Sequence, residues 1–282
     1  MGLFDRFKTS HDAPESEIAP PEAIVRSEPS RMRAVPDVDD DAGDFEASVR
    51  EHMARLTAAA DADVAALSPA EFDAALTSRL VGAERIQATG LGFSYASSFA
   101  QHIHEVLTLD LPTSVVTLPD SRIAETGRRI PGLLNKGRTN LLELLETTPV
   151  DVQRIGQGGR SVYAAMSDSP YTASFARFLT DAVYRWLPEL DDRNGFVFAV
   201  PYRHTIIFQP CSTPAEIRDA LDLVPDYAQR LHDEGDSPVS MHAYHWLGRK
   251  ITCLTTEEAD GTISVQPTEA LEQAMGLGRR AG

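Results

Sequence analysis

Hydrophobic residues recur at helical spacing in several separate stretches of the chain. In the block 169–190, Tyr171, Phe175, Leu179 and Trp186 fall on one apolar stripe, which is typical of an amphipathic helix packed on a sheet. The same spacing predicts further helices at residues 44–60, 68–80, 96–104, 120–145 with an interruption around Pro131, 213–232 and 268–275.

Two of these helices carry a start signal of their own. Ser68 is followed by a proline and then by Glu71, and Thr213 is followed by a proline and then by Glu216. In such a capping box the hydroxyl and the carboxylate each accept an N–H of the first helical turn, and proline tolerates the first helical position. The sequence therefore predicts helix starts at both sites.

Short runs of β-branched and aromatic residues, separated by Gly, Pro and Asp, predict strands. They lie at 85–90, 106–112, 114–118, 150–155, 160–166, 196–201, 204–210, 243–246, 250–255 and 262–266. The GQGG stretch at 156–159 indicates the tight turn of a hairpin. Because most strands follow one another while the helices come in blocks, we expect an α+β fold with a mainly antiparallel sheet and helices packed on it.

The first part of the chain lacks this patterning. Residues 9–43 are rich in Pro, Glu, Asp and Ser, and the acidic run DVDDDAGD occupies 37–44. Such a stretch cannot bury enough apolar surface to offset the entropy lost on ordering it. We therefore expect a disordered acidic tail at 1–43 and a single α+β domain at 44–282, with residue 119 as a candidate point of subdivision.

Charge limits the range of partners. The chain of 282 residues carries a formal net charge of −16, so nucleic-acid phosphates would be repelled and nucleic acid is not an expected partner. No window of 18 consecutive apolar residues occurs, so no membrane span is expected. The two cysteines, Cys211 and Cys253, form no disulfide or zinc pattern and fit a cytoplasmic protein.

The segment GLLNKGRT at 132–139 is one residue away from the phosphate-loop pattern, with Arg138 in the position of the lysine. A phosphate loop needs a buried strand before its glycine-rich turn, whereas the preceding residues ETGRRIP are charged and contain a proline. Arginine is also bulkier than lysine and forked. We therefore interpret the segment as part of an amphipathic helix that starts near Pro131, and we expect no nucleotide cofactor.

Two histidine pairs have spacings found in metal sites. His102 and His104, or His242 and His245, could each share a face and bind zinc if a third ligand such as Glu105 joined them. No HExxH motif accompanies either pair, so no metal is expected.

The polar residues that remain as candidates lie at two structural junctions. Arg203 and His204 form a corner between two apolar strands, and Asp168 and Tyr171 precede the amphipathic helix at 169–190. Polar groups at such positions can form a binding site on a rigid sheet, and we take these four residues as candidate binding residues. The alternative is that they form a turn and a helix cap. No catalytic residue can be nominated, since G-x-S-x-G is absent and acidic residues are numerous.

Several segments resemble a family in the same order along the chain. They are SPAEFDAALTSRL at 68–80, the helix with Asn140 and Leu141, DSPYTAS at 168–174, GFVFAVP at 195–201 with a basic corner after it, and PVS at 238–240. In this order they are similar to uncharacterised bacterial cytosolic proteins of a domain of unknown function, the YtpQ-like proteins. His204 stands where the family leads us to expect an acidic residue. The resemblance implies an intracellular bacterial protein and a helix at GLLNKGRTNLL, but no activity.

These observations favour a non-enzymatic protein-interaction or regulatory domain, although whether the chain is an enzyme is left open. One alternative is a hydrolase-type enzyme with a pocket near Arg203 and His204. Another is an immunity or inhibitor protein whose acidic surface neutralises a basic partner.

Overall fold

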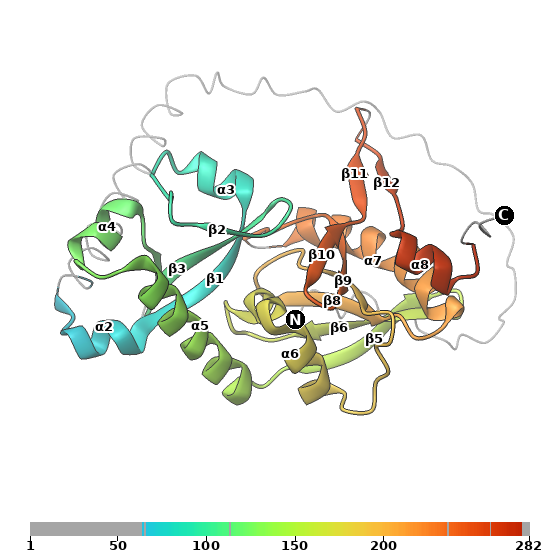
Figure 1. Ribbon diagram of the computed structural model, residues 1–282, viewed down its shortest axis with the longest axis horizontal. Helices are drawn as coiled ribbons and strands as arrows, with labels where there is room; N and C mark the ends of the chain where they lie inside the picture. Colours follow the sequence, from blue (N-terminus) through green and yellow to red (C-terminus); the bar gives the residue numbers. More distant parts are fainter. Residues whose placement is uncertain (1–63, 65, 113, 236, 260, 278–282) are drawn as a thin grey trace, which may run out of the picture. The chain divides into compact units, whose positions relative to one another are not determined.

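The computed structural model describes residues 64, 66–112, 114–235, 237–259 and 261–277, all within one unit that spans Met53–Gly282. The fold is α+β, with antiparallel sheets and helices packed on them, as predicted (Figure 1). The predicted tail at 1–43 and the predicted helix at 44–60 lie outside the described residues.

The first half of the described chain forms a four-stranded sheet around one central strand, β3 (Ile103–Leu111). β3 pairs antiparallel with β1 (Leu76–Gly82), β2 (Ser97–Ala100) and β4 (Ser114–Thr117). The helices of this half are α2 (Pro69–Ala75), α3 (Ala83–Ala88), α4 (Asp120–Glu125) and α5 (Ile130–Thr147). The long helix α5 packs on β1 and β3.

The second half forms a six-stranded antiparallel sheet in the order β10-β9-β7-β8-β6-β5. Its strands are β5 (Asp151–Gln157), β6 (Arg160–Met166), β7 (Phe196–Ala199), β8 (Thr205–Pro210), β9 (Ala243–Leu247) and β10 (Lys250–Cys253). α7 (Pro214–Glu234) packs on β6, β7 and β8, and the 3-10 helix η2 (Thr172–Phe178) also packs on β8 and continues into α6 (Leu179–Trp186) (Figure 1). A two-stranded ribbon of β11 (Thr255–Glu257) and β12 (Ile263–Val265) and the helix α8 (Glu269–Ala274) complete this half.

One hydrophobic cluster joins the two halves. It contains Leu80 and Ile103 from the four-stranded sheet together with Phe175 from η2 and Phe198 from the six-stranded sheet. Side chains of both sheets are therefore removed from water in a common core, which is the main source of stabilisation in a domain of this size.

Several segments with strong local signals have the predicted structure. Both capping boxes are formed, with the Ser68 and Thr213 hydroxyls accepting the N–H groups of Glu71 and Glu216. The GQGG turn joins β5 to β6, and Gly158 and Gly159 both have positive φ, which the tight hairpin turn requires. The predicted break near Pro131 separates α4 from α5.

Three predictions in the first half were wrong. The helix from Ser68 ends at Ala75, and Leu76 and Leu80 lie in β1, where pairing with β3 buries every residue. The predicted strand at 85–90 is largely helix α3, and the predicted helix at 96–104 contains β2 and the start of β3. These segments are short, so strand pairing outweighs their weak local preferences.

The block 169–190 is only partly the predicted α-helix. It begins as η2, and Phe178 then leaves helical geometry, with φ of −122° and ψ of 41°, before α6 starts at Leu179. All five residues from Thr172 to Ala176 are buried. The tighter 3-10 turn therefore fits a segment enclosed on several sides rather than one with a single apolar face.

Gly137 allows α5 to pack closely on β1. A methyl group at this position would lie 2.8 Å from Leu107 Cδ2 and 3.0 Å from Ser78 N, so helix and sheet could not both keep their places. A methyl group on Gly132, in the first turn of the same helix, would meet no neighbouring atom within 4 Å. The two glycines of GLLNKGRT therefore differ in their structural role.

Replacing Gly137 by Ala should destabilise the protein by about 1–3 kcal/mol, because the added methyl overpacks the contact between α5 and β1. The matched change Gly132→Ala should stabilise it by up to about 1 kcal/mol through helix propensity alone. Urea unfolding followed by circular dichroism measures both. Equal effects of the two substitutions would show that the helix does not pack on the sheet at Gly137.

Candidate functional site

The segment GLLNKGRT lies entirely in α5, and its arginine binds an internal carboxylate. Arg138 Nε donates to Glu105 Oε1 at 2.8 Å, and Arg138 Nη2 donates to Glu105 Oε2 at 2.5 Å. Glu105, on β3, is only 2% exposed. In this bidentate contact, two N–H groups on one side of the guanidinium each donate to one oxygen of the carboxylate. Arg138 is thus a structural partner of Glu105, and its segment is the predicted helix.

Glu105 has further partners from other elements. Arg177 Nε, at the end of η2, lies 3.5 Å from Glu105 Oε2, and the Ser78 hydroxyl on β1 donates to Oε1 at 2.9 Å. Burial alone would raise the pKa of Glu105, but the hydrogen bonds and charge of Arg138 and the charge of Arg177 hold this pKa below its usual value. The carboxylate is therefore charged at neutral pH and ties β1, β3, α5 and η2 together.

The predicted corner of Arg203 and His204 is a closed hydrogen-bonded turn. His204 Nδ1 lies 3.1 Å from Ser167 O and 3.0 Å from Ser169 O, so it carries a hydrogen and donates to these carbonyls. His204 Nε2 in turn accepts the Arg203 Nε–H at 2.8 Å. Both ring nitrogens are engaged, and in this arrangement neither is available to take a proton from a substrate.

The other two candidate binding residues, Asp168 and Tyr171, do not join a common site with this corner. Asp168 is exposed in the loop before η2. Tyr171 is only 1% exposed, and its hydroxyl lies 3.4 Å from Thr108 Oγ1 on β3. Burial raises the pKa of the Tyr171 phenol to about 12. The structure thus brings Arg203 and His204 together with the loop of Asp168, while the Tyr171 side chain points into the core between the two halves.

The two histidine pairs separate into different environments. His104 lies within β3 opposite Val81, whereas His102 lies in the turn before it with φ of 68°. His245 is engaged at both nitrogens, 2.8 Å from Asn194 O and 2.8 Å from Thr268 Oγ1. Among the residues that the structure describes, no group of three or more His, Cys, Asp or Glu side chains is arranged to hold a metal ion.

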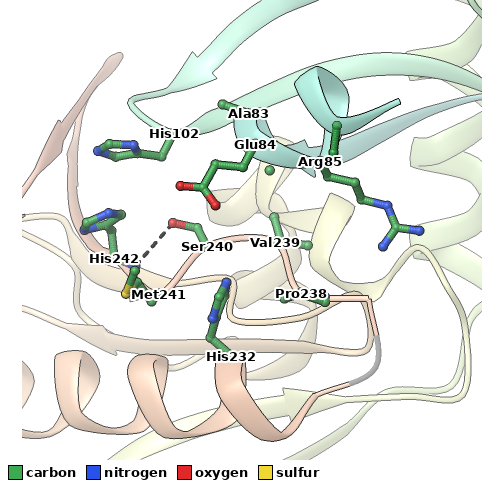
Figure 2. A pocket seen from close by; sticks show the side chains of 12 residues that line it. Ala83, Glu84, Arg85, His102, His232, Pro238, Val239, Ser240, Met241 and His242 are labelled. Atoms are coloured by element: carbon green, nitrogen blue, oxygen red, sulfur yellow. Dashed lines mark hydrogen bonds between the residues drawn. The ribbon is translucent and has the colours of Figure 1, made fainter. Parts of the chain in front are cut away.

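A cavity of about 290 Å³ collects three histidines that are remote in sequence. His102 comes from the β2–β3 turn, His232 from the last turn of α7, and His242 from the segment that leads into β9. Figure 2 shows the Glu84 side chain of α3 reaching over the same space, with Arg85 directed away from it. Ala83, Ala88, Val239 and Met241 supply apolar lining. We take this cavity as the candidate functional site.

The hydroxyl groups next to the cavity form a directed chain. Tyr244 donates its hydrogen to Gln101 O at 2.8 Å, so Ser240 donates to the Tyr244 oxygen at 2.7 Å. The Ser240 oxygen also accepts the His242 N–H at 3.2 Å. The hydrogen of Ser240 is therefore directed toward Tyr244, which does not suit a nucleophile activated by a histidine base.

His242 is the buried member of the three histidines. It is 7% exposed, and its Nδ1 lies 3.0 Å from Thr255 Oγ1. Burial, followed by the charges of His102 and His232, lowers the pKa of His242 to about 4. At neutral pH it is an uncharged hydrogen-bonding group.

Sequence reasoning missed this cavity because its lining comes from four separate segments between Gly82 and His242. His102 and His242 were singled out, but as members of two different pairs. They meet only because the β2–β3 turn packs against the segment before β9, and no local sequence pattern predicts that contact.

A second feature lies at the edge of the six-stranded sheet. β5 is an edge strand of seven residues whose side chains are exposed or half-buried, and it pairs with β6 in a continuous register. In the described part of the chain, no backbone hydrogen bond reaches its outer side. β5 contains no proline and its register shows no bulge, and an edge of this kind is open to pairing with another strand.

Comparison with known proteins gives no relative: no protein-family model, no curated protein and no solved structure matches this chain. The resemblance to YtpQ-like proteins therefore stays a prediction. Within the described ranges, no helix has the length and apolar character needed to cross a membrane.

Replacing Glu105 by Gln should destabilise the protein by roughly 3 kcal/mol at pH 7, at the low end for a broken buried ion pair because both arginines are partly exposed. The wild type should lose this advantage progressively as the pH falls from the ordinary carboxylate pKa of 4.5 through the lowered pKa of folded Glu105, because the unfolded chain takes up the proton first. Urea unfolding at pH 7 and pH 4 measures both effects.

The control for this comparison is Asp73→Asn, which removes the exposed ion pair of Asp73 with Arg128. Because water screens this pair, the change should cost less than about 1 kcal/mol. A cost for Glu105→Gln no larger than that of the control would show that the buried carboxylate does not join the two halves.

Proposed function

We propose that this chain is a non-enzymatic protein-interaction or regulatory domain that binds an extended segment of a partner protein along β5. The observation that carries the proposal is the open outer edge of this strand. An added strand would extend the six-stranded sheet by main-chain hydrogen bonds, which is a common mode of peptide recognition.

The register identifies the groups that would pair with such a segment. Gln157 and Arg160 flank the two-residue turn, so they form a hydrogen-bonded pair, and every second residue along β5 bonds to β6 in the same way. The N–H and C=O groups of Val152, Arg154 and Gly156 then point away from β6. An extended partner can bond to these three residues without any change in β5.

The opposite edge of the sheet differs, because β10 contacts β2 of the four-stranded sheet. Charged side chains often protect free edges, and β5 carries only Asp151 and Arg154 for this purpose. The Arg154 guanidinium lies over the Tyr163 ring, with its central carbon 5.0 Å from the ring centroid, so it stands over the sheet face beside β6. The outer backbone groups of β5 therefore remain accessible.

The hydrogen bonds of the polar candidate residues support a non-enzymatic role. The nitrogens of His204 are both hydrogen-bonded, the hydrogen of Ser240 is directed toward Tyr244, and Arg138 binds Glu105. A hydrolase with its pocket at Arg203 and His204 would need a free base there. The net charge of −16 would in addition steer positively charged partners toward the protein.

The test compares two substitutions at one position. Arg154→Pro removes the outward N–H and should abolish partner binding, whereas Arg154→Thr removes the same side chain, keeps the N–H and should bind nearly as well as the wild type. Full-length baits would first retrieve partners from the source cytosol. Binding of the purified partner to each variant would then be measured by calorimetry, and thermal melting would confirm that both variants fold.

Amide hydrogen exchange provides the second readout. Bound partner should protect the N–H groups of Val152, Arg154 and Gly156, which are open in the free chain. Equal binding by the proline variant, or protection confined to other elements, would exclude β5 as the docking strand. Failure of the full-length wild type to retain any partner would refute the interaction role itself.

A further inference from the structure

The His102 and His242 rings stack face to face. Their centroids are 4.2 Å apart, and their planes differ by 21°. His102 lies in the exposed β2–β3 turn, and His242 is buried at the entrance to β9. Figure 2 shows the two rings on one side of the cavity, one above the other. We call this pair the histidine stack.

The stack lies where the two sheets meet. Close to it, Tyr244 of β9 donates to Gln101 O at 2.8 Å, and the Ala83 N–H donates to His102 O at 2.9 Å. Gly82, at the end of β1, approaches the segment before β9 so closely that a methyl group on it would lie 2.5 Å from Val239 O. These contacts join residues 82–83 and 101–102 to residues 239–244, and we call them the joint.

The charged and titratable groups around the stack come from every element that borders it. α3 contributes Glu84 and Arg85, α7 contributes His232, and the strands beyond the stack contribute Tyr244 and Cys253. His232 Nδ1 lies 3.3 Å from the Asp233 carboxylate. Glu84 is the one carboxylate among the residues that line the cavity, and it is exposed, so water weakens its effect on His242.

Two protonated imidazoles at this separation repel each other, and the buried ring would in addition lose its hydration. The depressed pKa of His242, about 4 against an ordinary 6.5, reflects these costs, with burial as the larger cause. A histidine with a lowered pKa contributes stability that is present above pH 6.5 and is lost as the pH falls toward about 4, because the opened form binds the proton more readily.

We propose that the histidine stack makes the joint a pH-sensitive switch, which is closed at neutral pH and opens when acid protonates the buried His242 ring that stacks on His102. Opening would separate the β2–β3 turn from the segment before β9 and widen the cavity beside His232. The switch is independent of β5, which lies at the opposite edge of the six-stranded sheet.

The size of the effect follows from proton linkage. If the opened joint restores the ordinary pKa of His242, the equilibrium for opening should rise about 30-fold between pH 7.5 and pH 5. The pairing between β7 and β8 contains no histidine, so it should keep its protection over this range until the whole domain unfolds.

The first experiment measures amide hydrogen exchange in the full-length protein at pH 7.5 and pH 5, expressed as protection factors. The wild type should lose about 30-fold in protection at residues 101–102 and 239–244 but not in the pairing of β7 with β8. His242→Phe keeps an aromatic ring and removes the titrating group, so the loss should disappear. Equal losses in the wild type and in His242→Phe would overturn the proposal, as would a loss spread evenly over the domain.

The second experiment keeps the proposal testable if His242→Phe does not fold. His102→Asn leaves the buried site intact, and asparagine accepts the positive φ of this turn. An NMR titration should then show the pKa of His242 rising above that in the wild type, because the charge of His102 is gone. The pH-dependent loss of protection should become smaller. An unchanged pKa of His242 would show that the stacked rings are not coupled.

His245 serves as a matched control, since burial also lowers its pKa. It follows Tyr244 in the chain, but its side chain binds Asn194 and Thr268 and makes none of the contacts of the joint. His245→Gln should change the pH at which the whole domain unfolds and leave the local loss at the joint. If this substitution removed the local loss, acid sensitivity would belong to the sheet as a whole and the proposal would fail.

Discussion

A buried carboxylate held by two guanidinium groups connects the parts of this fold. Glu105 lies on the central strand of the first sheet, and its partners Arg138 and Arg177 come from α5 and η2. A carboxylate this deeply buried is tolerated only when its charge is compensated by hydrogen bonds and opposite charge. The position of α5 on β1 and the packing of η2 between the two sheets therefore depend on one ion cluster, and Gly137 allows the helix to come close enough to form it.

Other polar residues that were considered as catalytic or binding candidates are likewise held by hydrogen bonds within the fold. Arg203 and His204 close a turn onto the loop before η2, and Ser240 and Tyr244 fasten the β2–β3 turn to the segment before β9. Hydrogen bonds that satisfy buried polar groups stabilise the fold and at the same time remove free donors and acceptors from any reaction. The described residues do present an open strand edge and a cavity lined by histidines, on which the proposed binding and regulation depend.

Local sequence signals predicted many elements of the fold. The capping boxes at Ser68 and Thr213, the Gly158–Gly159 turn and the break before Pro131 each depend on a few adjacent residues, so the local sequence is enough to predict them. The strands of the second half were found for a similar reason, since their runs of apolar β-branched and aromatic residues are long and bounded by turn residues. The α+β class and the antiparallel pairing followed from the order of these elements.

Tertiary contacts determined the features that the sequence did not predict. Residues 76–80 continue a helical pattern, yet they lie in β1, because seven pairings of this strand with β3 and complete burial outweigh helix propensity in so short a segment. The partner of Arg138, the core position of Tyr171 and the stack of His102 on His242 all join residues far apart in the chain. The sequence alone thus determined those elements whose stabilising contacts are local. Only the folded structure decided which remote polar groups meet, because each of those meetings depends on the packing of the whole domain.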